Sequence, residues 1–83
     1  MRYNGLDLNL IVALDAVLEE ASVTKAAERL NLTQPALSSA LARLREYFGD
    51  ELLVQVGRRM VPTPYAQSLR PLAARMLREA QLL

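Results

Sequence analysis

Apolar side chains recur at three- and four-residue steps in the first half of the chain, the spacing of helices with one buried face. One such stripe runs from Asp7 to Glu20, and Asp7 is a good helix N-cap. Ser22 is the expected cap of a second, short helix that ends near Leu30. The apolar positions of the two helices are Leu10, Ile11, Leu14, Val17, Leu18, Ala26, Ala27 and Leu30.

A third helix is predicted over Gln34–Phe48. Asn31 suits the left-handed turn before it, Thr33 is its cap, and Pro35 lies in the first turn, where a missing N–H costs no hydrogen bond. Its buried stripe is Leu37, Ala40, Leu41, Leu44 and Phe48. The opposite face carries only small or polar side chains and an arginine: Ser38, Ser39, Ala42 and Arg43. Such a helix is anchored on one side and open to close approach on the other.

After the third helix the pattern changes to β-branched residues around a turn. We expect two short strands, Leu53–Val56 and Met60–Pro62, with Gly57–Arg59 as the hairpin tip. Thr63 and Pro64 then start a last helix, as a cap followed by a proline at the first helical position.

The last helix carries an apolar stripe spaced like a coiled-coil seam. The stripe consists of Leu69, Leu72, Met76, Ala80 and Leu83. Pro71 lies inside this helix and is expected to bend it. A helix this long exceeds what so small a body can cover, so we expect the stripe to form a homodimer. The neighbouring Arg70, Arg75 and Arg78 favour antiparallel or angled helices, because parallel helices in register would bring like charges together.

A short and a longer helix joined by a tight turn form a helix-turn-helix, whose second helix enters the DNA major groove. The predicted fold class is therefore mainly α: a winged helix-turn-helix of three helices and a short β-hairpin, followed by a long linker helix. We assign residues 1–62 to the DNA-binding domain and residues 63–83 to the linker and dimerisation helix.

Composition supports a nucleic-acid partner only through the distribution of charge. The net charge of the 83 residues is +1, but residues 1–42 hold three basic and five acidic residues, whereas residues 43–83 hold seven and four. The chain has no His and no Cys, so the usual metal ligands and the common general base are missing, which argues against an enzyme. No apolar run is long enough for a membrane span, so no membrane partner is expected.

Each candidate residue has two interpretations, a role in DNA binding and a purely structural or solubilising role. Gln34 and the serines of the third helix can read base edges, or they can simply form a solvated face. Arg58 and Arg59 can enter the minor groove as a wing, or they can keep a hairpin edge soluble. Ser22 and Thr24 can bind a phosphate at the positive end of the second helix, or they can only cap it.

The stretch "SVTKAAERLNLTQPALSSALARLREYFGDELLVQVGRRMVPTP" resembles the N-terminal DNA-binding domain of LysR-type transcriptional regulators. The "GRRMVPTP" segment looks like the subgroup that contains nodulation regulators and regulators of aromatic-compound degradation. The resemblance implies a dimer through antiparallel linker helices, often a tetramer of the full protein, and a C-terminal domain, outside this chain, that binds a small-molecule inducer. It implies no cofactor in this fragment.

Carried over by position, the resemblance assigns a groove-facing set, Gln34, Pro35, Ala36, Ser38 and Ser39, and a phosphate-contacting set, Ser22, Thr24 and Arg43. The complete expected DNA-binding set is Ser22, Thr24, Thr33, Gln34, Pro35, Ala36, Ser38, Ser39, Arg43, Arg58 and Arg59. Three positions depart from the family pattern: Ser39 replaces a frequent Arg or Lys, Leu53 a frequent Phe, and Gln55 a frequent Arg. These departures put more weight on the two wing arginines.

The expected partner is double-stranded DNA with a palindromic operator, bound in the bacterial cytoplasm at the nucleoid. The alternative is a helical protein–protein interaction module. The two differ in salt dependence, because counterion release makes DNA binding weaken steeply with ionic strength.

Overall fold

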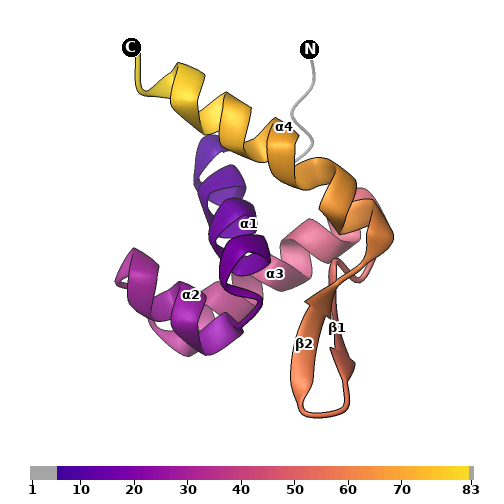
Figure 1. The fold of residues 1–83 in the computed structure, drawn as a ribbon. Coiled ribbons are helices and arrows are strands. Elements are labelled where there is room, and N and C mark those ends of the chain that lie inside the picture. The colour runs from indigo at the N-terminus through magenta and orange to yellow at the C-terminus, as the bar shows by residue number, and fades with distance from the viewer. Residues whose placement is uncertain (1–5, 83) are drawn as a thin grey trace.

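The computed structural model describes residues 6–82, and this part of the chain forms four helices and one two-stranded hairpin. The elements in chain order are α1 (Leu8–Glu20), α2 (Val23–Leu30), α3 (Gln34–Phe48), β1 (Leu53–Val56), β2 (Arg59–Pro62) and α4 (Pro64–Ala80). In Figure 1, α4 crosses one end of α1, and the hairpin projects from the body on the side away from α4. The predicted winged helix-turn-helix with a following helix is confirmed.

Each helix begins at a side chain that satisfies a free backbone N–H of its first turn. Asp7, Ser22, Thr33 and Thr63 accept these bonds, at 2.9, 3.1, 3.2 and 3.1 Å. The first three helices end at residues with left-handed backbone angles, Ala21, Asn31 and Gly49. The four predicted caps are confirmed, so local sequence sets where every helix starts.

The core is built around α1. Its buried face meets the inner faces of α2, α3 and α4, and the largest fully buried side chains are Val17, Leu14, Leu18, Leu37, Leu44, Leu52 and Leu53. Ala26 and Ala27 are the buried residues of α2. Their small side chains allow α2 to lie close to α1 and α3, which brings the helix-turn-helix pair together.

One face of α4 packs on its own domain. Ala66 and Ala73 are buried, and Leu69 and Leu77 pack against the core. Leu69, expected as part of the dimerisation stripe, is thus partly covered by its own domain. Periodicity alone predicts that an apolar stripe is covered but not by which surface, and at Leu69 the covering surface is the core of the same domain.

The rest of the predicted stripe is divided. Leu72 and Met76 remain 54% and 50% exposed, and Ala80 is half-buried. Leu83 lies outside the described residues. Pro71 lies inside α4 and is exposed. The uncovered apolar face of α4 is thus narrower than the sequence pattern indicates.

The hairpin is one residue tighter at its tip than expected. β2 begins at Arg59 rather than Met60, because Arg59 pairs directly with Val56 in the antiparallel ladder. Only Gly57 and Arg58 form the turn, and Gly57 takes a φ of +64°, which a glycine adopts without strain. Arg58 therefore lies in the turn and Arg59 on a strand, so the two arginines occupy different structural positions.

A hydrogen-bonded joint connects the end of α3, the start of the wing and the start of α4. One oxygen of the Asp50 carboxylate accepts from the Leu52 N–H at 2.8 Å and from the Thr63 hydroxyl at 2.7 Å. The Thr63 N–H in turn donates to the Leu52 carbonyl at 3.0 Å. These bonds hold Leu52, which is fully buried, at a left-handed φ of +65° that non-glycine residues rarely adopt.

Replacing Asp50 by Ala removes the acceptor for two donors at this joint. We expect Asp50→Ala to lower the free energy of unfolding by about 1–3 kcal/mol, the cost of leaving part-buried donors without a partner. Urea unfolding measures this change. Glu79→Ala serves as the control, because among residues 6–82 the Glu79 side chain forms one ion pair, with Arg75 across an exposed helix turn, at 3.7 Å. That change is expected to cost about 0.3–0.5 kcal/mol. Equal effects from the two substitutions would show that the joint does not stabilise the fold.

Candidate nucleic-acid interface

The outer face of α3 is polar and open along its length. Its inner side chains Leu37, Leu41 and Leu44 are 0%, 3% and 0% exposed. All residues of the predicted groove-facing set, together with Ala42 and Arg43, are exposed. The structure therefore brings Gln34, Pro35, Ala36, Ser38, Ser39, Ala42 and Arg43 together on the free surface of one helix.

The first turn of α3 is prepared for an electronegative partner. Thr33 accepts from the Ala36 N–H through its hydroxyl oxygen, and its hydroxyl hydrogen remains able to donate. The aligned peptide dipoles add partial positive charge at this end of the helix. Thr33 thus combines a capping role with a free donor next to Gln34.

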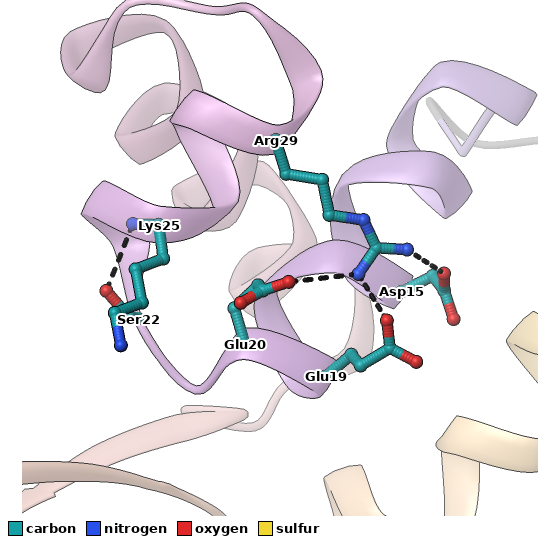
Figure 2. Close-up of polar contacts among 6 residues, drawn as sticks. All are labelled: Asp15, Glu19, Glu20, Ser22, Lys25 and Arg29. Atoms are coloured by element: carbon teal, nitrogen blue, oxygen red, sulfur yellow. Dashed lines mark hydrogen bonds and ion pairs between the residues drawn. The ribbon is translucent and has the colours of Figure 1, made fainter.

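A second donor group lies at the start of α2. The Ser22 hydroxyl accepts from the Lys25 N–H at 3.1 Å, as Figure 2 shows, and Thr24 is exposed. Lys25 is also exposed and makes no ion pair with any other residue in the range 6–82. Lys25 is not among the DNA-binding residues expected from the sequence, although its position three residues after a capping serine places it in the first helical turn.

The single arginine of α2 serves the fold instead. Figure 2 shows Arg29 of α2 reaching three carboxylates of α1. It pairs with Glu19, with Glu20 at 3.3 Å and with Asp15 at 3.4 Å. Burial acts to lower the pKa of Arg29, but its hydrogen bonds and attraction to Glu19, and then those to Glu20 and Asp15, raise the pKa above its ordinary value. Arg29 is thus fully charged and holds α2 to α1.

The wing offers two exposed arginines on a stiffened hairpin. Arg58 and Arg59 are exposed, and neither they nor Arg43 form an ion pair within the described part of the chain. The Gln55 side-chain amide donates to the Gly57 carbonyl at 3.2 Å and so braces the turn. The departure at Gln55 therefore removes a possible arginine contact but adds a bond inside the wing.

Both signs of charge occur on each side of the molecule, but three arginines of α3 and the wing make no ion pair among the described residues. Arg43, Arg58 and Arg59 lie on α3 and the wing, whereas Asp15 and Glu19 border the grooves between α1 and α4. The three arginines without ion pairs favour a polyanionic partner on the α3 and wing side. An exposed helix with a small, polar outer face, next to a hairpin bearing unpaired arginines, defines a winged helix-turn-helix DNA-binding domain.

Comparison with known proteins agrees with this class. Residues 8–67 match the family described as "Bacterial regulatory helix-turn-helix protein, lysR family". Nodulation protein D 1 of Rhizobium meliloti (strain 1021) is 56% identical over 82 residues, which are 99% of this chain and 27% of that protein. Nodulation protein D 2 of Bradyrhizobium elkanii is 61% identical over 69 residues, which are 83% of this chain and 21% of that protein.

Solved structures show the same fold. A probable transcriptional regulator from Pseudomonas aeruginosa superimposes with a TM-score of 0.85 at 41% identity, over 92% of this chain and 25% of that one. The BenM DBD in complex with benA site 1 DNA superimposes with a TM-score of 0.84 at 32% identity, over 93% of this chain and 86% of that one.

The chain therefore belongs to the LysR family of bacterial regulatory helix-turn-helix proteins. This membership makes it a sequence-specific DNA-binding domain of a transcription regulator, rather than an enzyme. The chain spans about a quarter of the length of the curated relatives it matches. Within residues 6–82, no helix combines the length and apolar character needed to cross a membrane.

Lys25 provides the first test of this surface. We expect Lys25→Ala to weaken binding to all DNA sequences alike and to reduce the slope of log affinity against log salt by about one, as for one lost phosphate contact. Titrations at several salt concentrations measure the slope. Arg70→Ala on α4 removes the same charge and is expected to leave the slope unchanged. If the slope stays constant for Lys25→Ala as well, Lys25 does not contact the backbone.

Proposed function

We propose that this domain reads DNA with the N-terminal half of α3 in the major groove and with the hairpin tip Gly57–Arg59 in the adjacent minor groove. The observation that carries the proposal is the contrast between the two faces of α3. Its inner leucines are almost fully buried, while its outer face carries exposed side chains short enough for close approach. This fixes the helix firmly and leaves the groove-facing side free.

The side chains of α3 differ in what they can recognise. Gln34 has the amide geometry that pairs with adenine, and Ser38 and Ser39 can bond to bases or phosphates. Arg43, further along the helix, suits guanine or phosphate. The small side chains of Pro35, Ala36 and Ala42 allow the backbone of α3 to approach the groove closely.

The groups suited to phosphate lie at the N-terminal ends of α2 and α3. Ser22 and Thr24 lie at the positive end of α2, and Thr33 lies at that of α3. Arg58 in the turn and Arg59 on β2 reach the flanking minor groove, where a narrow A·T-rich segment attracts cationic side chains. The phosphate contacts set the position of the domain, and the α3 contacts set its sequence preference.

We further propose that two copies join through the uncovered face of α4. Tyr65, Leu72 and Met76 follow one another at steps of seven and four, so they share a helix face, and they are 43%, 54% and 50% exposed. A symmetric contact between two such faces buries them and presents two α3 helices to a palindromic operator. Leu69 and Ala80 border this face, and Leu83 belongs to the same spacing in the sequence. Residues 63–83 then serve as the linker and dimerisation helix, and residues 1–62 as the DNA-binding unit.

The full-length protein is proposed to add regulation. The chain covers 27% of Nodulation protein D 1. The resemblance to LysR-type regulators implies a C-terminal domain of the full-length protein that binds a small-molecule inducer. Two dimers can then assemble into a tetramer. The protein would act on the chromosome, in the bacterial cytoplasm at the nucleoid.

A helical protein–protein interaction module is the competing function. The salt dependence of affinity distinguishes the two functions. DNA binding weakens steeply with ionic strength, whereas an apolar contact between helices does not. Affinity for duplex DNA at increasing salt therefore tests the proposal, and a flat response contradicts it.

Base reading by Gln34 is testable with a site selected from random duplexes. We expect Gln34→Ala to lose about 1–3 kcal/mol on the selected site and little on random DNA, because a lost base contact removes discrimination rather than general affinity. Gln67→Ala, an exposed glutamine on α4, is the matched control and is expected to change neither. Equal losses on both DNAs would reassign Gln34 to the phosphate backbone.

The α4 interface is testable without DNA. We expect the wild-type domain to sediment as a dimer at micromolar concentration and the double variant Leu72→Asp, Met76→Asp to sediment as a monomer, because charges cannot be buried in an apolar seam. The monomer would also bind a palindrome far more weakly. Leu32→Asp changes an exposed leucine between α2 and α3 and is expected to leave the dimer intact. A double variant that stays dimeric would place the interface elsewhere.

A further inference from the structure

The side chain of Arg45 is bonded to the backbone at the base of the wing and is not part of the exposed outer face of α3. It lies near the end of α3, and its Nε donates to the Glu51 carbonyl at 2.7 Å while one terminal nitrogen donates to the Leu53 carbonyl at 2.9 Å. The Glu51 carboxylate adds an ion pair with Nε at 3.6 Å. One guanidinium of the recognition helix therefore holds the first residue of β1 and the chain two residues before it.

These two carbonyls flank the kink by which the chain enters the wing. Leu52, between them, has the left-handed φ of +65° and is fully buried. A planar guanidinium with two bonds in fixed directions constrains orientation as well as distance, and its charge strengthens each bond. Arg45 thus fixes the direction in which β1 leaves the body.

Packing on the core holds the hairpin along part of its length but does not reach its tip. Along β1 the side chains change from fully buried at Leu53 to 59% exposed at Val56. On β2, Met60 still packs against the core, whereas Arg59 is exposed, so the packing ends before the tip. At the other strand, Thr63 bonds to Asp50 just beyond β2. The tip of the wing therefore extends beyond the packed residues, and a small rotation at the base of the hairpin moves the tip by a larger distance.

We propose that Arg45 is a positioning residue that sets the angle between the recognition helix and the wing, and so determines whether Arg58 reaches the minor groove beside the site that α3 reads. The inference rests on the proposed function of the wing. It makes Arg45 a determinant of flank preference although it touches no DNA. If Arg45 only stabilises the fold, its substitution lowers the free energy of unfolding but leaves the contribution of Arg58 to DNA affinity unchanged.

Thermodynamic coupling separates these roles. Affinities for one selected duplex are measured for wild type, Arg58→Ala, Arg45→Met and the double variant, at a temperature where melting curves show every variant folded. We expect Arg58→Ala to weaken binding about tenfold in the wild-type background and less than about threefold in the Arg45→Met background, as for residues that depend on each other. Arg70→Met, which removes a charge from α4, is the control background and is expected to retain the full tenfold effect.

Each outcome has one meaning. A tenfold effect of Arg58→Ala in both the wild-type and Arg45→Met backgrounds overturns the inference and leaves the proposed wing contact standing. No effect of Arg58→Ala in wild type instead refutes the wing contact, and the inference with it. Arg45→Lys keeps the charge but offers a point donor in place of the planar fork, so we expect an intermediate effect of Arg58→Ala in that background. If Arg45→Met does not fold, Arg45→Lys decides, and a full tenfold effect there overturns the inference.

Discussion

The packing of α3 against α1 is the interaction on which the rest of this domain depends. A helix that presents small, polar side chains outward has little apolar surface with which to hold itself in place. Leu37, Leu41 and Leu44 supply that surface on the opposite side, where all three are almost completely buried. Because the inner face is anchored so firmly, the outer face is free to vary with the DNA sequence it reads.

Polar ties then relate the other elements to this helix. Asp50 links the end of α3 to Thr63 at the start of α4, and Arg45 links α3 to the base of the wing. At the other end, Arg29 holds α2 to α1. Groups that serve geometry are thus separate from those left unpaired for a partner, such as Arg43 and Arg58. The basic groups in this small domain have divided roles, which net charge alone does not reveal.

Much of the fold was predictable because the signals that define it are local. A capping side chain and the N–H it satisfies lie three residues apart, so Ser22, Thr33 and Thr63 could be identified from sequence. The exposed face of α3 followed from the helical period. The start of β2 was misplaced because it depends on the pairing of Arg59 with Val56, which lies across the turn.

Other features depend on tertiary geometry that the sequence pattern does not encode. Leu69 belongs to the same periodic stripe as Leu72, and only the packing of α4 on the core shows that Leu69 is partly covered and Leu72 is exposed. Arg45 reads as one more surface arginine, because its partners are backbone carbonyls around the left-handed kink at Leu52. Lys25 lacked a distinctive pattern, and only its exposure beside Ser22 draws attention to it.

The central claim is that α3 occupies the major groove and the wing the minor groove. A dimer then brings two copies of each to the two halves of a palindrome. Dimethyl sulfate protection tests all three parts at once, because it reports guanine N7 in the major groove and adenine N3 in the minor groove. On a selected palindrome, the account predicts two blocks of protected guanine N7, separated by whole helical turns, each beside protected adenine N3. Protection confined to one groove, or to one half of the palindrome, would contradict it.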